Sequence, residues 1–327
     1  MSDVSPQPPS PARSSFRRRP TLVTAPTTPL GSVLVEDLLA TGHPVLAVHD
    51  EAAPAHRVPG ARYVRADLTR YRDTRELLRG PAAELNVRAI VHTALHRDPR
   101  GHGLHVWQQN VQSTRQLLSL AEADARIERF VFRSHAEVYR AEVHEPVMLG
   151  EDAPLELSPK APQRVRDRVE ADMLVCAKMG VSRLGIVVLR CAEVVAPELG
   201  SQLQDYLASS VCLTPLGYDP MINVLSPRDA ARAQRLAVDG DAVGVFNIPG
   251  LDTLPLSQLV RRSGAVGVPV PGPALGPLYG LRALARGAEF RYGMNRRRFH
   301  HSALLDGTHA QQELGYVPRH ASDLRMR

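Results

Sequence analysis

The sequence predicts an α/β fold in which a doubly wound parallel sheet is followed by a smaller C-terminal lobe. Short, continuously apolar segments of the kind buried in parallel sheets alternate with segments whose apolar residues recur at helical spacing. The chain has 327 residues, which is enough for one large α/β unit or for two lobes. Alternation of this kind is typical of a sheet covered by helices on both faces.

The expected elements follow one another in a regular order up to about residue 190. The expected strands are 21–24, 43–50, 61–67, 89–92, 129–134 and 184–190. The expected helices are 30–40, 74–78, 111–123 and 165–179. The later signals are weaker, with a helix at 229–238, a strand at 244–248 and a Gly- and Pro-rich stretch at 264–277. We therefore divide the chain into a tail (1–19), a sheet domain (20–190), a smaller lobe interleaved with it (191–320) and a second tail (321–327).

The composition is that of a globular chain without a membrane span. Hydrophobic residues make up 43%, and no run approaches the roughly 18 apolar residues that suggest a transmembrane helix. Residues 1–19 have no periodic apolar pattern and no apolar region of a secretory signal, so we expect them to be disordered. These features predict a cytoplasmic protein.

Positive charge is concentrated in two segments. The net charge is +6, and residues 1–19 contain four arginines and one aspartate while residues 282–300 contain six arginines and one glutamate. Such segments fit a solvated surface better than nucleic acid, an anionic membrane or an acidic partner, and nucleic acid is not expected. The stretch 275–300 mixes apolar residues with arginine, so a membrane surface is an alternative to a helix packed on the core.

The turn after the first strand determines whether a dinucleotide can bind. In a Rossmann unit, glycines in this turn let backbone amides and the helix N-terminus approach a pyrophosphate. A Gly-x-x-Gly-x-x-Gly pattern would put glycines at 25, 28 and 31, but the chain has Ala25, Thr28 and Gly31. Two added Cβ atoms, together with Pro26 and Pro29, should hinder cofactor binding.

Two aspartates occupy positions suited to the adenosine half of a dinucleotide. Asp50 ends the second strand, where a carboxylate accepts from a ribose and disfavours a 2′-phosphate, which favours NAD over NADP. Asp67 ends the third strand and is a candidate for the adenine amine. The alternatives are a surface turn for Asp50 and a helix N-cap for Asp67.

Nine spaced motifs occur in a characteristic order. They are Leu-Val-Thr-Ala-x5-Gly31, Val-His-Asp50, Arg-Ala-Asp67-Leu, Ile-Val-His92-Thr-Ala94, Asn110-Val-x-x-Thr114, Arg129-Phe-Val-Phe-x-Ser134-x-Ala-Glu-Val-Tyr139, Leu189-Arg190, Phe246-Asn247-Ile and Glu313-Leu-Gly-Tyr-x-Pro318. Over about residues 20–320 the chain thus resembles the extended short-chain dehydrogenases/reductases, the NAD-dependent epimerase/dehydratase family, and in particular bacterial proteins named UDP-glucose 4-epimerase-like.

The resemblance implies an NAD-binding Rossmann domain with a nucleotide-sugar lobe, and a homodimer is compatible with it. The implied cofactor positions are Ala25, Thr28, Leu30, Gly31, Asp50, Asp67, Leu68, His92, Thr93, Ala94, Asn110 and Ser134. The implied substrate positions are Glu193 and Asp229.

The catalytic pair of that family is a tyrosine and a lysine four residues later, which share one helix face. None of the eight tyrosines has a lysine at that spacing. The expected place has Lys160 and Arg164, or Pro162 and Arg166 in a shifted register. Arginine can hold a phosphate but cannot replace a titrating phenol.

We therefore predict a catalytically inactive or strongly impaired protein, a pseudoenzyme. One alternative is an active oxidoreductase or epimerase whose acid/base is His135, at the family's Ser/Thr position, near Tyr139 or Lys160. Another is a scaffold or regulatory subunit that binds a nucleotide sugar, another small molecule or an unidentified protein partner. No metal site is expected, because the histidines of 92–105 lack an acidic or thiol ligand at metal spacing.

Overall fold

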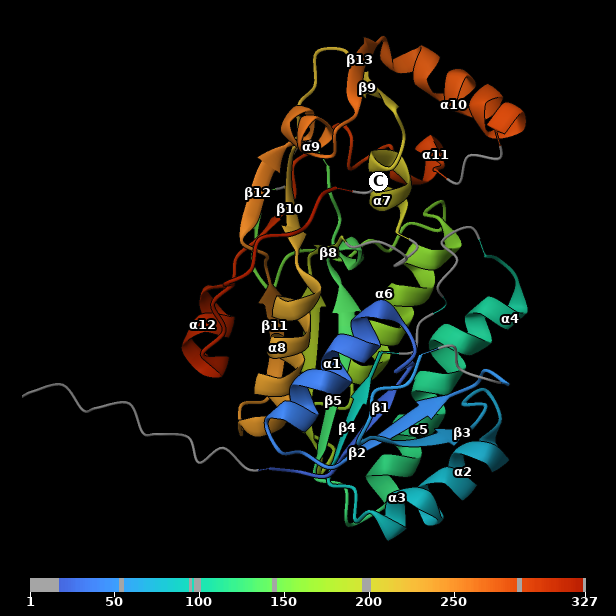
Figure 1. Cartoon of the computed structure of the whole chain (residues 1–327), viewed down its shortest axis with the longest axis vertical. Coiled ribbons are helices and arrows are strands. Elements are labelled where there is room, and N and C mark those ends of the chain that lie inside the picture. Colours follow the sequence, from blue (N-terminus) through green and yellow to red (C-terminus); the bar gives the residue numbers. More distant parts are fainter. Residues whose placement is uncertain are drawn as a thin grey trace, which may run out of the picture.

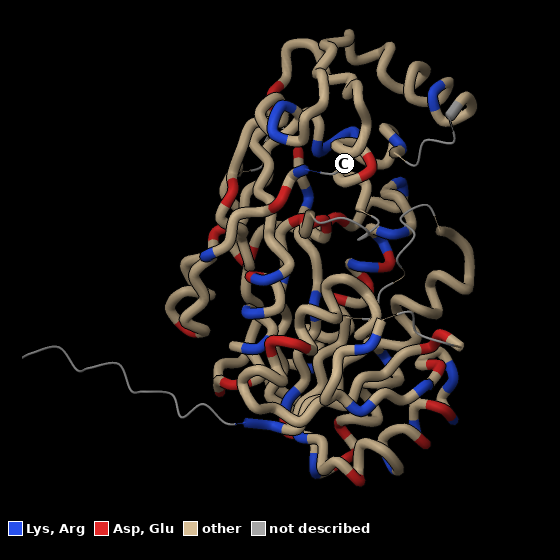
Figure 2. The backbone as a smooth tube through the Cα atoms, viewed as in Figure 1, with Lys and Arg blue, Asp and Glu red and all other residues tan. Residues whose placement is uncertain are grey.

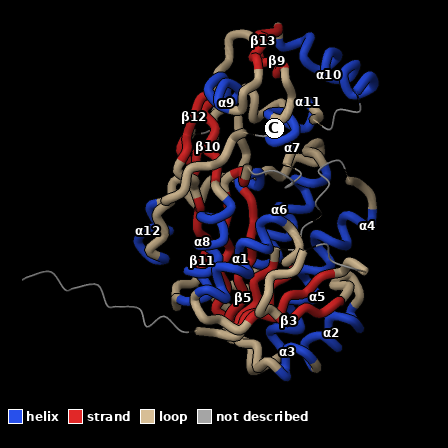
Figure 3. The backbone as a smooth tube through the Cα atoms, in the orientation of Figure 1, coloured by secondary structure: helices blue, strands red, loops and turns tan. Residues whose placement is uncertain are grey.

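The computed structural model describes residues 18–52, 56–93, 96, 101–142, 146–195, 201–286 and 290–325. A sheet domain and a C-terminal lobe are stacked along the long axis of the molecule (Figure 1). Figure 3 shows the sheet enclosed by helices in the first and smaller strand groups in the second.

A seven-stranded sheet forms the first domain, and all its paired strands are parallel. Its spatial order is β11-β7-β5-β4-β1-β2-β3. The strands are β1 (Thr21–Thr24), β2 (Val45–His49), β3 (Arg62–Arg65), β4 (Ala89–His92), β5 (Arg129–His135), β7 (Gly185–Cys191) and β11 (Gly244–Ile248). From β1 the chain builds the sheet outward through β2 and β3 on one side, and then through β4, β5 and β7 on the other. This strand order is that of the Rossmann fold, so the predicted doubly wound fold is confirmed.

Helices cover both faces of this sheet. One face carries α1 (Pro29–Ala40), α8 (Pro227–Asp239) and α12 (Thr308–Leu314). The other face carries α2 (Tyr71–Arg79), α5 (Ser113–Ala123) and α6 (Gln163–Cys176), with the short α3 (Pro81–Glu84), α4 (Leu104–Trp107) and π-helical η1 (Gln108–Gln112) nearby. Neighbouring strand residues belong to opposite cores, Leu22 to one and Val23 to the other, because side chains alternate along a strand.

The C-terminal lobe contains elements that the sequence did not predict. They are β8 (Glu193–Val194), α7 (Gln202–Leu207), β9 (Val211–Pro215), β10 (Met221–Leu225), β12 (Asp252–Pro255), α9 (Leu256–Arg262), β13 (Val266–Val270) and α11 (Tyr292–Asn295). In contrast, α10 (Gly272–Arg286) overlaps the stretch 275–300, for which a helix is one of the expectations. Short pieces connect the lobes: η2 (Ala136–Val138) and the pair β6 (Met148–Leu149) with β14 (Leu304–Leu305). The Gly- and Pro-rich stretch is therefore a strand of a two-stranded sheet and the start of a helix.

The end of the predicted N-terminal tail requires a correction. Arg19 is only 5% exposed, and its guanidinium donates to the carbonyl oxygens of Asp239 at 3.1 Å and Gly240 at 3.2 Å. These carbonyls lie at the C-terminal end of α8, where a cation satisfies acceptors that the helix leaves free. Arg19 is thus part of the fold, and residues 1–17 lie outside the described residues.

Candidate functional site

The turn between β1 and α1 has a hydroxyl at the helix N-terminus. The Thr28 hydroxyl accepts from the amide of Gly31 at 2.8 Å and donates to the Ala25 carbonyl at 2.9 Å. Pro29 is the first helical residue and has no amide hydrogen. Within the described part of the chain, the Leu30 amide is then the donor in the first turn of α1 that has no hydrogen-bond partner. A pyrophosphate would need several such free amides.

The backbone of this turn retains the geometry of a glycine turn. Ala25 has φ of 50°, a left-handed conformation that favours glycine. A Cβ on Gly31 would lie 2.1 Å from the Ala25 carbonyl oxygen. Gly31 is therefore required by close contact within the turn, whether or not a ligand binds there.

The two aspartates expected near adenosine differ in their surroundings. Asp50 follows β2 and is exposed. The Asp67 carboxylate accepts from the Thr69 amide at 2.9 Å and from its hydroxyl at 2.6 Å, while Leu68 is buried. Asp67 thus stabilises the turn before α2, whose N-cap residue is Arg70 and not Asp67, and the Asp50 carboxylate is accessible to a ligand.

His92 lies in the interior of the sheet domain. Its Nδ1 is 3.1 Å from the Thr24 hydroxyl and its Nε2 is 3.0 Å from the Thr114 hydroxyl. Burial lowers the pKa of His92 to about 3, so the ring is neutral. The amide of Thr93 also donates to the Thr24 hydroxyl at 2.8 Å. These side chains join β1, β4 and α5 rather than face a ligand.

The remaining cofactor candidates are also bonded to protein groups. The Asn110 amide donates to Asp167 Oδ2 at 3.2 Å and its oxygen accepts from the His96 amide at 2.7 Å. The Ser134 hydroxyl donates to Asp172 Oδ2. Ala94 lies outside the described residues.

Tyr139 is held in a buried network. Its hydroxyl donates to Asn247 Oδ1 at 2.7 Å and accepts from Arg190 at 3.1 Å, and Arg190 pairs with Asp172 at 2.7 Å. Tyr139 is 4% exposed, and burial raises the pKa of its phenol. A phenol with both roles occupied and a raised pKa is poorly suited to proton transfer.

A cavity of about 290 Å³ lies between the lobes. Lys160, Ala161 and Val165 line it on the sheet-domain side, and Met221 and Ile222 on the lobe side. Further titratable side chains from both lobes line it, among them His135, Glu137, Glu156, Glu193, Arg296, Arg297 and Arg298. The Lys160 side chain is exposed, so it reaches the cavity from the surface.

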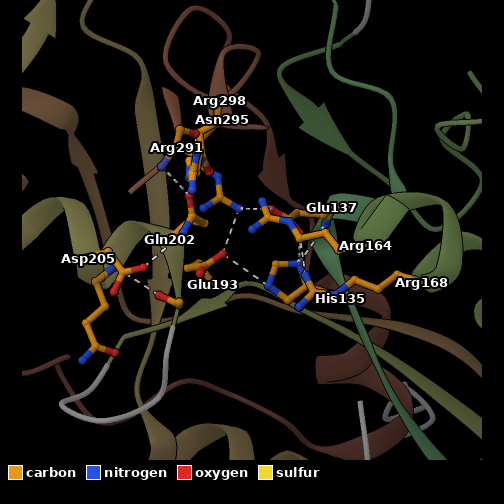
Figure 4. Close-up of polar contacts among 12 residues, drawn as sticks. His135, Glu137, Arg164, Arg168, Glu193, Gln202, Asp205, Arg291, Asn295 and Arg298 are labelled. Carbon is orange, nitrogen blue, oxygen red and sulfur yellow. Dashed lines mark hydrogen bonds and ion pairs between the residues drawn. The ribbon is translucent and has the colours of Figure 1, made fainter. Parts of the chain in front are cut away.

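A buried ion cluster at this cavity includes His135 and Arg164, two of the predicted catalytic candidates (Figure 4). Glu137 Oε1 is 2.6 Å from Arg164 and 3.0 Å from Arg298, and its other oxygen pairs with Arg168. Arg298 also contacts Glu193 at 2.8 Å. We call the set of His135, Glu137, Arg164, Arg168, Glu193 and Arg298 the ion cluster. Arg298 comes from the C-terminal lobe, so the ion cluster joins the two lobes across the cavity.

The charge states within the ion cluster follow from these contacts. Burial opposes ionisation of Glu137, but its three arginine neighbours outweigh burial and lower its pKa to about 2. Arg298 and His135 likewise hold the pKa of Glu193 well below its usual value, against the effect of burial. Both carboxylates are therefore ionised at neutral pH.

His135 has both ring nitrogens engaged. Its Nδ1 accepts from the backbone amide of Glu137 at 3.0 Å, and its Nε2 lies 3.3 Å from Glu193 Oε2. Burial lowers the pKa of His135, which favours the neutral ring. The donating amide puts the proton of that ring on Nε2, directed at Glu193.

Of the two expected substrate residues, Glu193 lines the cavity and Asp229 does not. Asp229 is fully buried and accepts from the backbone amides of Arg319 at 2.8 Å and His320 at 2.7 Å. It anchors the C-terminal segment. Ser322 and Leu324, expected in a tail, also pack on the lobe.

Sequence reasoning missed three members of the ion cluster. Glu137 was noted only as part of a motif, Arg168 was not singled out, and Arg298 was assigned to a basic surface segment. The adjacent arginines 296–298 were the available signal, because buried arginines need carboxylate partners.

The fold and cleft define an α/β protein with a Rossmann-type sheet domain and a smaller C-terminal lobe. The model of the NAD dependent epimerase/dehydratase family matches residues 22–210. An uncharacterized protein of Mycobacterium tuberculosis is 31% identical over 286 residues, which cover 84% of this chain and 73% of that protein. The chain belongs to the NAD dependent epimerase/dehydratase family, as the resemblance predicted.

Solved structures show the same fold at low identity. UDP-glucose 4-epimerase of Thermus thermophilus in complex with NAD has a TM-score of 0.70 at 18% identity and covers 94% of this chain and 96% of its own. MoeE5 in complex with UDP-glucuronic acid and NAD has a TM-score of 0.69 at 20% identity, with coverage of 94% and 97%. At this identity the likeness is one of fold.

Proposed function

We propose that this protein is a pseudoenzyme of the epimerase/dehydratase family that binds a small anionic ligand between its lobes without converting it. The observation that carries the proposal is the ion cluster. In the shifted register of the family pair, Pro162 and Arg166 stand for the tyrosine and the lysine. In the other register Arg164 stands for the lysine and is paired with Glu137, and Lys160, an exposed cation, stands for the tyrosine. None of these groups can take the role of a titrating phenol at neutral pH.

The alternative acid/base, His135, is disfavoured by its hydrogen bonds. A general base needs a free lone pair directed at the substrate. In His135 the Nδ1 lone pair is used by the Glu137 amide, and Nε2 faces Glu193. The imidazole would have to break one of these contacts before it could receive a proton.

We infer that NAD binds weakly or not at all. The Thr28 hydroxyl occupies the Gly31 amide, and Pro29 removes a further donor from the helix N-terminus. The exposed Asp50 carboxylate supports a preference for NAD over NADP in whatever binding is retained, because it disfavours a 2′-phosphate.

The cavity suits a nucleotide sugar better than a neutral apolar ligand. Lys160, Arg296 and Arg297 line it together with the apolar Met221 and Ile222. Cations recognise phosphate, and apolar walls accommodate ring faces. MoeE5 and UDP-glucose 4-epimerase of Thermotoga maritima, structural neighbours of this chain, were solved with nucleotide sugars.

The test is calorimetric titration with UDP-glucose, UDP, NAD and NADP, combined with an assay for epimerisation of UDP-glucose with added NAD. We expect saturable heat with UDP-glucose, none or little with NAD, and no turnover. Ala303→Trp, which fills the cavity wall, should abolish the UDP-glucose heat, while Ala123→Trp on the exposed end of α5 should not.

Micromolar NAD affinity, or turnover that His135→Ala abolishes, would contradict the proposal and favour the rebuilt active site. If Ala303→Trp leaves the heat of UDP-glucose binding unchanged, the ligand binds outside this cavity. In this role the protein would be a cytoplasmic bacterial protein that acts as a binding or regulatory subunit. A homodimer or an unidentified protein partner is then expected, and light scattering of the purified protein tests the first.

A further inference from the structure

Exposed apolar side chains gather on the end of the C-terminal lobe farthest from the parallel sheet. This end consists of β9, β13 and α10 (Figure 1). Its exposed apolar residues, which we call the apical face, are Val211, Leu216, Val266, Val268, Leu278, Leu281 and Leu284. Single exposed apolar residues are ordinary, but a group on adjoining elements marks a surface that something covers.

Helix α10 is apolar on two opposite sides. Leu275 is 0% and Tyr279 4% exposed, and both pack on the aromatic core of the lobe. Leu281 is 63% and Leu284 86% exposed, and at about 100° per residue Leu284 points almost directly away from Leu275. A helix that is apolar all round is stable when both sides are buried. The lobe buries only one.

Part of α10 also has no element of the lobe packed against it. A groove of about 610 Å³ separates α10 from α11, lined on the α10 side by Gly276, Gly280 and Leu284. A Cβ at either glycine would meet no atom within 4 Å. The helix therefore stands away from the lobe over part of its length, which leaves its apolar face accessible.

Basic residues predominate around this face, although the exposed Asp219 lies close to Leu216 in the sequence. Residues 253–286 contain four arginines and no aspartate or glutamate. Of these, Arg262 contacts Asp252 at 3.4 Å, while Arg261 and Arg282 make no ion pair within the described part of the chain. Figure 2 shows α10 with basic but no acidic residues. A second copy of the chain would bring like charges together across a two-fold axis, whereas anionic headgroups complement them.

We propose that the apical face binds an anionic lipid surface, with α10 lying in the plane of the headgroups. The 15 residues of α10 extend about 22 Å, and within the described residues no helix is long and apolar enough to cross a membrane. Exposed leucines on the outer side of α10, within a segment of the sequence that is basic overall, suit a helix that lies in the interface, although Arg282 itself donates to the Val211 carbonyl at 2.6 Å. The inner side of α10 packs on the core of the lobe, as the expected core-packed helix would. A core-packed helix does not account for the exposed leucines on its outer side.

The test is co-sedimentation of the full chain with vesicles of phosphatidylcholine alone and of phosphatidylcholine mixed with an equal amount of phosphatidylglycerol. We expect binding to the mixed vesicles only, weakened by added salt. Leu281→Glu/Leu284→Glu should weaken binding at least about tenfold, because it removes two apolar contacts and adds two like charges. Val181→Glu, at a residue 78% exposed on the sheet domain, should leave binding unchanged.

Thermal unfolding of each variant establishes that it is folded, which is expected because the substituted leucines are exposed. Absence of binding by the wild-type chain to mixed vesicles would overturn the proposal. Equal loss of binding with Val181→Glu would do so as well. A wild-type dimer that the double leucine variant converts to a monomer, without vesicle binding, would assign the apical face to a second copy of the chain.

Discussion

Replacing Glu137 by glutamine removes one negative charge from the ion cluster and keeps the size of the side chain. The carboxylate is only 12% exposed and pairs with Arg164, Arg168 and Arg298. Its pKa falls from the ordinary 4.5 to about 2 in the folded protein, and a shift of this size corresponds to about 3 kcal/mol at neutral pH. Removing one partner of a buried ion pair costs about 3–5 kcal/mol. The two values agree.

The dependence on pH follows from the lowered pKa. A carboxylate with a depressed folded-state pKa stabilises the folded state fully above its unfolded pKa, and this contribution disappears as the pH falls through its folded pKa. For Glu137 the window runs from about 4.5 down to about 2. Urea unfolding followed by circular dichroism at neutral and acidic pH measures it. The wild type should exceed Glu137→Gln by about 3 kcal/mol at pH 7, and the difference should shrink within that window.

The matched control is Glu84→Gln. The Glu84 side chain is 61% exposed and lies 2.6 Å from Arg62, so the pair has similar geometry but full solvation. Its loss should cost at most about 1 kcal/mol. If Glu137→Gln is no more destabilising than Glu84→Gln, and equally independent of pH, the ion cluster does not stabilise the fold and the reasoning fails.

Two further substitutions test individual contacts. Gly31→Ala puts a Cβ 2.1 Å from the Ala25 carbonyl and should lower the free energy of unfolding, measured by calorimetry, by about 1–3 kcal/mol. The control Gly276→Ala, in open space on α10, should leave the free energy of unfolding unchanged or raise it. Equal effects of the two substitutions would contradict the close contact at Gly31. Asp229→Ala removes the acceptor for Arg319 and His320 and should speed amide exchange over 319–322. Asp323→Ala removes an acceptor for the Arg325 amide only and should leave exchange over 319–322 unchanged; unchanged exchange with Asp229→Ala would show that this segment is held by other contacts.

The sheet domain was predictable because its signal is local. The predicted strand 43–50 contains β2 (Val45–His49), and the predicted 129–134 lies within β5 (Arg129–His135). Strands buried on both faces are continuously apolar, so each of them can be recognised from its own residues alone. The C-terminal lobe differs, because β13 contains Gly267 and Pro269 and is a strand only through its pairing with β9. Such pairing overrides local propensity.

The candidate site was predictable in position but not in composition. The motif around Ser134 and Tyr139 spans the end of β5, and Arg164 pairs with Glu137, which lines the cavity. The contact between Glu137 and Arg298 joins residues separated by 161 positions. No spacing rule links them, because the contact exists only once the C-terminal lobe closes on the sheet domain.

The members of the ion cluster depend on one another. An unpaired buried charge is strongly destabilising, so Arg164 without Glu137, or Glu193 without Arg298, would not persist in the cleft. Arg298 binds Glu137 after β5 and Glu193 in β8, and it therefore couples the two lobes. An acid or base in a working site must change its protonation during turnover, whereas these carboxylates are kept ionised by their arginine partners. The contacts that join the two lobes thus also keep these carboxylates ionised, which supports the binding role that we propose for the cavity.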